Sequence, residues 1–329
     1  MTALAPLLQA FFTDRLAAQR HASPHTVLSY RDAFRLLLDY AANTTGKAPS
    51  ALDIADLDAA LIGGFLDHLE HGRHNSVRTR NNRLAAIHSL FTYAALHHPE
   101  HADTISRVLA IPVKRYDRTM LTWLTETEID ALLAAPARST WTGRRDHALL
   151  VLAVQTGLRI SELISLTCAD THLGGGAHVR CVGKGRKQRA TPLTKHTVAV
   201  LRTWLDEQPG TPTAPLFPTR TGNALSRDAV EHRLTGYLAI ASSNCSSLQG
   251  RHITMHTLRH TAAMRLLQSG TDIAVIALWL GHEQLATVQI YLHADMEQKE
   301  RALARLTPPG TRSGRYKPPD PLLAFLRQL

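Results

Sequence analysis

The sequence has few cysteines and no long apolar segment. Its 329 residues include three cysteines, Cys168, Cys181 and Cys245, which lie far apart and form no CxxC pair. Scattered cysteines in odd number argue against a disulfide framework and against a cysteine zinc site. Apolar runs such as ALLVLAV at 148–154 are far shorter than the roughly 20 residues that a membrane span needs. These absences predict a soluble protein of the reducing cytoplasm with no membrane role.

A nucleotide-binding loop is missing as well. Gly46 and Lys47 lack the upstream glycine and the following serine or threonine of a phosphate-binding loop, and no other segment of that type appears. We therefore expect a reaction that needs no hydrolysis of ATP or GTP.

Positive charge is in excess. The chain has 37 Lys+Arg against 27 Asp+Glu, a net charge of +10 and a pI near 9.9. A basic surface gains affinity for a polyanion by releasing counterions from its phosphates, so nucleic acid is the leading partner. A basic enzyme without such a partner remains the alternative.

The length predicts two domains, because 329 residues exceed the usual size of one core. Helical spacing dominates, with caps at Ser23 and at Thr125, the latter paired with Glu128 in a capping box. The expected class is mainly α with a small β-hairpin, an α+β protein. We expect a helical domain at 1–110, a linker at 111–124, a second domain at 125–306 and a tail at 307–329.

One amino-terminal helix combines an apolar face with a basic start. It begins at the caps Asn75 and Ser76, and its later part predicts an inward face of Leu84, Ile87, Leu90, Phe91 and Ala94. Arginine and asparagine at a helix start can bind phosphates and base edges. A solvated polar face is the alternative. We expect DNA contacts here and at basic residues further along the chain: Arg78, Arg80, Asn81, Asn82, Arg83, Lys114, Arg115, Arg186, Lys187 and Arg189.

Acidic residues precede the segment AALIGGFLDHL. Asp53, Asp56 and Asp58 fit the start of a helix, where carboxylates accept hydrogen bonds from free backbone N–H groups. A carboxylate metal cluster is the less favoured alternative.

The second domain carries a predicted hairpin. A buried helix ends at Gly157, and Ser161 is the expected cap of the next helix. Strand residues around Val179 and Cys181 then lead into a turn with Lys184 at its tip.

A histidine-rich helix begins near Thr254. His256, Arg259 and His260 share one face at positions i, i+3 and i+4. His252, His256 and His260 are spaced four apart, but the glutamate of a zinc-protease helix is absent, which disfavours a metal site. A site that acts on a phosphodiester accounts for these residues better than a metal site. The reason is that the guanidinium of arginine is charged and can donate two hydrogen bonds to the oxygens of an attacked phosphate. A tyrosine attacks only if positive neighbours stabilise its phenolate, and a departing hydroxyl needs a proton.

The segments TGLRISEL, VGKGRKQR, HTLRH, LGH and QIYLH, in this order, resemble the tyrosine recombinases of the phage-integrase and Xer type. The resemblance spans nearly the whole chain. It implies a SAM-like helical core-binding domain followed by a catalytic domain. It also implies a set of roles. Arg159 and Arg259 would clamp the scissile phosphate, and His256 and His282 would hydrogen-bond it or assist proton transfer. Lys184 would be the general acid, Tyr291 the nucleophile, and Glu162 and His260 supporting residues.

The implied activity is site-specific DNA recombination. A 3′-phosphotyrosine intermediate would form without metal, cofactor or ATP, on double-stranded DNA held by a homotetramer, or together with a second recombinase. This activity would serve integration, excision or transposition of a mobile element, or resolution of DNA multimers. It would take place in the nucleoid of the cytoplasm. A DNA-binding accessory protein without turnover and a topoisomerase that relaxes one duplex remain alternatives.

The tail exposes more apolar surface than it can hide alone. It follows a Pro/Gly-rich stretch that can let it reach away from its own domain. We expect it to dock on a neighbouring subunit, with packing on its own domain as the alternative. The apolar residues are Leu322, Leu323, Phe325, Leu326 and Leu329.

Overall fold

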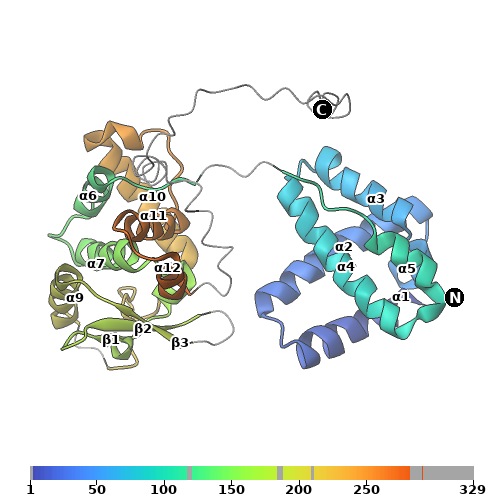
Figure 1. Ribbon diagram of the computed structural model, residues 1–329, viewed down its shortest axis with the longest axis horizontal. Helices are drawn as coiled ribbons and strands as arrows, with labels where there is room; N and C mark the ends of the chain where they lie inside the picture. Colours follow the sequence, from blue (N-terminus) through green and yellow to red (C-terminus); the bar gives the residue numbers. More distant parts are fainter. Residues whose placement is uncertain (1–2, 117–120, 184–187, 209–210, 282–290, 292–329) are drawn as a thin grey trace, which may run out of the picture. The chain divides into compact units, whose positions relative to one another are not determined.

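The computed structural model describes residues 3–116, 121–183, 188–208, 211–281 and 291. The chain divides into two compact units, Met1–Thr119 and Met120–Leu329 (Figure 1). Each unit has its own buried apolar core. The described part is mostly helical with one small antiparallel sheet, which confirms the predicted α+β class.

The first unit contains helices joined by loops, and an isolated β-bridge pairs Ala3 with Asp53. Its α-helices are α1 (Leu4–Ala10), α2 (Pro24–Thr45), α3 (Ala59–Asp67), α4 (Val77–His97) and α5 (Ala102–Leu109). Other helical segments join or extend them. These are π-helical at Phe11–Gln19 and His68–Gly72, and 3-10 at Pro49–Ala51, Ile54–Asp56 and Pro99–His101.

Serine caps begin two of these helices. The hydroxyl of Ser23 accepts a hydrogen bond from the backbone N–H of Thr26 at 3.2 Å, as predicted. Ser76 does the same for Thr79 at 3.2 Å, so Ser76 and not Asn75 is the cap of α4. Each cap satisfies a backbone donor that the first helical turn leaves free.

The aspartates before α3 serve as caps. Asp56 accepts a hydrogen bond from the backbone N–H of Asp53 at 2.8 Å and forms an ion pair with Lys47. These two interactions hold the pKa of the Asp56 carboxyl below its ordinary value, the backbone bond most strongly. Asp58 accepts from the N–H of Leu61 at 2.7 Å. Capping therefore accounts for these acids.

The core of the first unit gathers on the apolar face of α4. The face predicted from the sequence is buried at each of its positions, Leu84, Ile87, Leu90, Phe91 and Ala94. Aromatic rings complete this core, with Phe11 edge-on to Phe34 at 5.9 Å between ring centroids.

The second unit combines helices with a sheet. Thr125 and Glu128 form the predicted capping box at its first helix, with Thr125 N–H donating to Oε2 of Glu128 at 2.9 Å. The α-helices of its described part are α6 (Glu126–Ala134), α7 (Trp141–Thr156), α8 (Ile160–Ile164), α9 (Lys195–Asp206), α10 (Arg227–Asn244), α11 (Met255–Gln268) and α12 (Ile273–Leu280). None of the helices in the described ranges is both long and apolar enough to cross a membrane.

The sheet contains the predicted hairpin. Its strands β1 (Thr171–His172), β2 (His178–Val182) and β3 (Gln188–Pro192) are antiparallel in the order β1-β2-β3. Cys181 lies opposite Arg189 in the register of β2 and β3. Lys184, Arg186 and Lys187 belong to the connection between these strands and lie outside the described residues.

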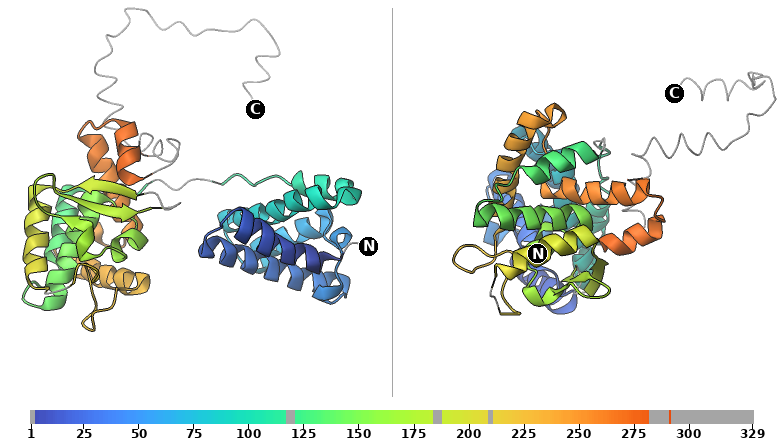
Figure 2. Two further views of the ribbon diagram at one scale, coloured as in Figure 1. Left: turned by 90° about the horizontal axis from the view of Figure 1, so that it is seen from below. Right: turned by 90° about the vertical axis from the view of Figure 1, so that its left-hand side faces the viewer.

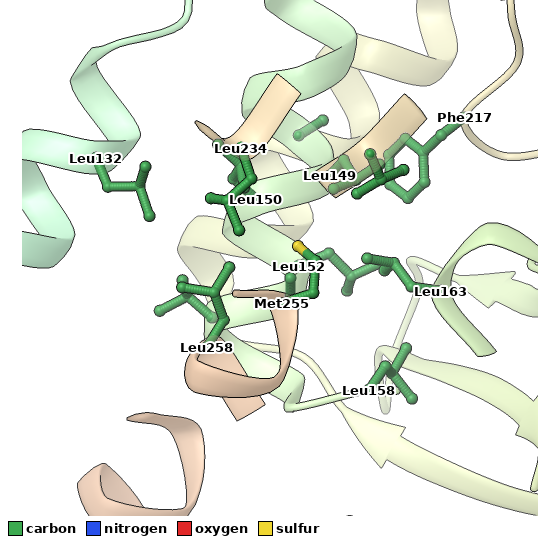
Figure 3. Close-up of a cluster of buried hydrophobic side chains, with 14 of the residues drawn as sticks. Leu132, Leu149, Leu150, Leu152, Leu158, Leu163, Phe217, Leu234, Met255 and Leu258 are labelled. Atoms are coloured by element: carbon green, nitrogen blue, oxygen red, sulfur yellow. The ribbon is translucent and has the colours of Figure 1, made fainter. Parts of the chain in front are cut away.

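The core of the second unit forms between α7 and α11. Leu149, Leu150 and Leu152 of α7 converge with Met255 and Leu258 of α11 (Figure 3). Helix α11 also packs against α12 (Figure 2). This packing brings the carboxyl ends of α7 and α12 together beside α11.

Candidate active site

Two helix ends meet at glycines with left-handed backbone. Gly157, after α7, has a φ of 63°, and Gly281, after α12, has a φ of 65°. A Cβ on Gly157 would lie 2.9 Å from Cδ2 of Leu280 and 3.0 Å from Cβ of Ala262. Glycine thus lets the two helix ends approach closely and turns their last carbonyl groups toward α11.

Arg259 of α11 binds both helix ends. Its guanidinium donates to the carbonyl of Gly157 at 2.7 Å and to that of Leu280 at 2.6 Å. The residue is only 2% exposed. Burial, followed by the charge of Arg159, lowers the pKa of Arg259 to about 10, so the group stays charged at neutral pH. The carboxyl ends of helices favour a cation at this place.

Arg159 stands at the start of α8, directly after the end of α7. Its guanidinium donates to Oε1 of Glu162 at 2.9 Å and to the carbonyl of Gly281 at 3.3 Å. Its backbone N–H donates to Oε2 of Glu162 at 2.8 Å. Arg159 is therefore the N-cap residue of α8, and the prediction of Ser161 as the cap is wrong. Glu162 at the third helical position supplies the capping bond instead.

Glu162 also binds Arg189 of β3. Nη1 and Nη2 of Arg189 donate to Oε1 and Oε2 of Glu162 at 2.9 and 2.7 Å. Burial favours the neutral acid, but the bonds and charges of Arg189 and Arg159 outweigh it and lower the pKa of Glu162 to about 2. The carboxylate is therefore ionised throughout the physiological range.

Tyr291 faces α11. Its phenol oxygen lies 3.0 Å from Nδ1 of His260, and the ring is 1% exposed. Burial raises the pKa of the phenol, whereas the charges of Arg259 and Arg159 act to lower it. Burial, with smaller contributions from His256 and Arg259, lowers the pKa of His260 to about 4. The imidazole is thus neutral at pH 7.

These groups form an anion-binding arrangement. Arg159 and Arg259 donate to the adjacent carbonyls of Gly281 and Leu280, and the charge of each acts against the burial that raises the pKa of the Tyr291 phenol. Two guanidinium groups so close together repel each other and gain energy from an anion placed between them and the phenol. A phosphate diester has the charge and the oxygen geometry for this place.

The structure describes six of the eight residues predicted for catalysis or its support and brings them together: Arg159, Glu162, His256, Arg259, His260 and Tyr291. His256 lies on the same helix, with its ring centroid 4.3 Å from that of His260, and is exposed. Lys184 and His282 lie outside the described residues. Within the described ranges, no group of three or more His, Cys, Asp or Glu side chains is placed to hold a metal ion.

The residues of the first unit that are predicted to contact DNA differ in how exposed their side chains are. Arg78, Asn82 and Arg115 are exposed, and Arg83 is half-buried. Arg80 is 5% exposed and donates to the carbonyl of Pro112 at 3.2 Å. The burial of Arg80 and its internal bonds argue against a DNA contact there.

Asn81 and Lys114 are engaged with each other. The amide of Asn81 donates to the carbonyl of Lys114 at 2.8 Å and accepts from its N–H at 3.2 Å. The Lys114 ammonium binds Glu70 at 2.9 Å. These bonds hold the first residues of the predicted linker against α4, so Asn81 has a structural function.

Sequence reasoning missed the function of Arg189 inside the protein. Arg189 was expected at the DNA, but its guanidinium is buried against Glu162, its side chain 12% exposed. The only signal was that Glu162 stands three residues after an arginine, a spacing that favours pairing at a helix start. That spacing cannot reveal a second arginine from a distant strand.

The chain matches the phage integrase family over residues 122–298 and the N-terminal SAM-like domain of phage integrases over residues 10–98. It is 55% identical over 326 residues to a putative integrase/recombinase, y4rC, of Sinorhizobium fredii, covering 99% of this chain and 98% of that protein. It is 34% identical over 286 residues to the tyrosine recombinase XerC of Xanthomonas campestris pv. campestris, covering 87% and 84%. The chain therefore belongs to the phage integrase family of tyrosine recombinases.

Solved structures share the fold. The XerH site-specific recombinase bound to its difH substrate has a TM-score of 0.65 at 24% identity, covering 87% of this chain and 81% of that one. The Tn1549 transposon integrase in complex with transposon right end DNA has a TM-score of 0.69 at 16% identity, covering 93% and 99%. At these identities, the likeness concerns the fold alone.

Proposed function

We propose that this protein is a site-specific DNA recombinase that cleaves and rejoins duplex DNA through a covalent phosphotyrosine at Tyr291. The phenol oxygen attacks the scissile phosphate and forms a bond to the 3′ phosphate while the bond to the 5′ oxygen breaks. Lys184 gives the departing 5′ oxygen its proton. The new 5′ hydroxyl of one duplex then attacks the phosphotyrosine on another, so each step exchanges one phosphoester for another. Neither metal nor ATP takes part.

One observation carries this proposal: the phenol of Tyr291 is buried and lies 3.0 Å from Nδ1 of His260, the residue that follows Arg259 on α11. Burial raises the pKa of this phenol, and the charges of Arg259 and Arg159 act in the opposite direction. An attacking tyrosine must lose its proton, and positive charge lowers the cost of the phenolate. The same guanidinium groups stabilise the charge that develops on the phosphate oxygens. His256 and His282 are proposed to donate further hydrogen bonds to that phosphate or to assist proton transfer, including acceptance of the phenol proton.

A nicked suicide substrate tests the chemistry, because the strand released beside the nick diffuses away and traps the covalent complex. We expect a protein–DNA adduct on a denaturing gel with the wild-type chain and none with Tyr291→Phe. Added EDTA should leave the adduct yield unchanged, and its loss in EDTA would contradict the metal-free mechanism. Binding without any adduct would instead indicate an accessory protein. Relaxation of one duplex without strand transfer between two marked duplexes would indicate a topoisomerase.

The proposed partners are double-stranded DNA and further recombinase subunits in a tetramer, either copies of this chain or a second recombinase. The relatives named integrase/recombinase and tyrosine recombinase support a function in DNA recombination. The proposed use is integration, excision or transposition of a mobile element, or resolution of DNA multimers, in the nucleoid of the cytoplasm. The tail at 307–329, outside the described residues, is proposed to dock on a neighbouring subunit. Deleting residues 311–329 should abolish synapsis and strand exchange. Unchanged exchange would contradict the docking.

A further inference from the structure

The carboxylate of Glu162 is shared between two arginines. Arg189 binds both oxygens, at 2.9 and 2.7 Å, whereas the side chain of Arg159 binds one oxygen, at 2.9 Å. The second oxygen also accepts the backbone N–H of Arg159. Glu162 therefore accepts four hydrogen bonds, which fix the plane of its carboxylate.

Arg159 and Arg189, the two arginines that bind Glu162, differ in the exposed fraction of their side chains. The side chain of Arg159 is 35% exposed, that of Arg189 is 12% exposed, and the Glu162 carboxylate between them is 4% exposed. Arg189 is thus the inner partner of the carboxylate, and Arg159 is the partner that an incoming phosphate can reach.

Arg189 fits closely against the end of α12. A Cβ built on Gly281 would lie 2.8 Å from Nη1 of Arg189 and 3.1 Å from its Cζ. The carbonyl of the same glycine accepts a bond from Nη2 of Arg159. One glycine therefore contacts both arginines, and strand β3 is joined through Arg189 to the starts and ends of the helices that carry the site.

We propose that Arg189 is a positioning residue that orients Arg159 through Glu162 and leaves the charge of Arg159 available to the scissile phosphate. Without Arg189, Glu162 would be free to turn toward Arg159 and to form a closed pair with it. A guanidinium neutralised in this way would offer less to the phosphate. With Arg189 in place, the negative charge of the Glu162 carboxylate is balanced by Arg189, on the side away from Arg159. This proposal rests on the proposed recombinase chemistry.

A change at Arg189 can slow cleavage by two routes, through Arg159 as proposed or through Lys184. Strand β3 begins at Gln188, shortly after the connection that carries Lys184, so a change at Arg189 can also act through that lysine. A substrate with sulfur in place of the bridging 5′ oxygen separates the two routes, because a thiolate leaves without a proton donor. A defect that acts through Lys184 disappears on this substrate, and one that acts through Arg159 persists.

The test uses the full chain in single-turnover cleavage of nicked substrates. The variants are Arg189→Gln, Arg189→Lys, Arg159→Ala and the double variant Arg159→Ala/Arg189→Gln. Arg180→Gln is the matched control, since Arg180 lies exposed on the neighbouring strand β2. Arg189→Gln should slow cleavage on the order of tenfold or more, as loss of a partner that orients an active group does elsewhere. Arg180→Gln should cleave at the wild-type rate.

Two further results are expected. The Arg189→Gln defect should keep its size on the bridging-sulfur substrate, and the double variant should cleave no more slowly than Arg159→Ala alone, because both changes remove one function. Wild-type cleavage by Arg189→Gln, recovery on the sulfur substrate, or additive losses in the double variant would each overturn the proposal.

Folding is controlled separately. If Arg189→Gln does not fold, Arg189→Lys carries the test, because its single ammonium keeps the charge but cannot bind both oxygens of Glu162 in the same way. A well-folded Arg189→Lys that cleaves like the wild type would overturn the proposal. Failure of the proposed function looks different, because the wild-type chain itself would then form no adduct.

Discussion

The phenol oxygen of Tyr291 lies 3.0 Å from Nδ1 of His260. Burial holds the pKa of this histidine near 4, so its ring is neutral at pH 7. With the ring proton on Nε2, Nδ1 accepts the hydrogen bond of the phenol. The proposed nucleophile is thus held by an uncharged partner, while the nearby arginines supply the charge that favours the phenolate.

The lowered pKa of His260 predicts an acid-dependent loss of stability. The folded-state pKa of about 4 lies below the unfolded value of about 6.5. Between these values the unfolded chain binds the additional proton, so this contribution is complete above about pH 6.5 and is lost as the pH falls toward 4. His260→Asn removes the titrating group and retains an amide near the Nδ1 position. Its melting temperature should therefore fall less than that of the wild type between pH 7 and pH 4.5.

Circular dichroism of the full chain checks this difference. His252, exposed just before α11, provides the control His252→Asn, whose melting temperature should follow that of the wild type across the same range. Parallel curves for His260→Asn and the wild type would show that His260 is not protected from protonation in the folded chain.

Arg259→Lys should impair catalysis more than a change of equal size elsewhere on α11. Lysine keeps the charge but cannot bind the carbonyls of Gly157 and Leu280 together and present a fork to a phosphate. We expect single-turnover cleavage to slow on the order of 10²-fold, or about 3 kcal/mol of transition-state stabilisation. Arg265→Lys, at an exposed arginine of the same helix, is the control and should cleave normally. Equal rates for the two variants would contradict the assigned role of Arg259.

Much of the local structure could be predicted because its causes are local. The capping box of Thr125 and Glu128 and the helix stop at Gly157 involve residues a few positions apart, so the sequence displays both partners. The order of the motifs further along the chain also identifies six side chains that the fold brings together. At the start of α8 the preference for serine at helix N-caps predicted the wrong residue. Ser161 has the side chain of a cap, but Arg159 is the N-cap residue and Glu162 accepts its backbone N–H.

Partners distant in the sequence were beyond such reasoning. Arg80 and Arg189 look like free basic residues, yet Arg80 donates to Pro112, 32 positions away, and Arg189 binds Glu162, 27 positions away. A positive side chain in a basic protein fits a DNA surface and a buried ion pair equally well. Only the three-dimensional packing decides between them.

Gly157→Ala should destabilise the second unit. An alanine there must adopt a left-handed backbone, and its Cβ must also fit 3.0 Å from Cβ of Ala262, which is fixed to α11 and cannot turn away. We expect a loss of about 2–4 kcal/mol in the free energy of unfolding, from strain and overpacking together.

The control is Gly176→Ala. Gly176 has a φ of 69°, but an added Cβ would meet nothing within 4 Å, so only the backbone strain of about 1 kcal/mol applies. Denaturant unfolding of both variants isolates the cost of the close approach. Equal losses would mean that the two helix ends are not held together as tightly as the distances indicate.

Exposed and buried arginines of the first unit should respond differently in DNA binding. Arg78 and Arg115 are exposed, and each phosphate contact that is lost should lower the slope of log affinity against log salt by about 1. Arg78→Ala and Arg115→Ala should therefore weaken binding and flatten this dependence while the melting temperature stays unchanged. Arg80→Ala should do the reverse, because it leaves the Pro112 carbonyl without its Arg80 donor and leaves Glu70 paired with Lys114 alone, at a cost of about 1–3 kcal/mol of stability. A flattened salt dependence for Arg80→Ala with normal stability would support Arg80 as a DNA contact after all.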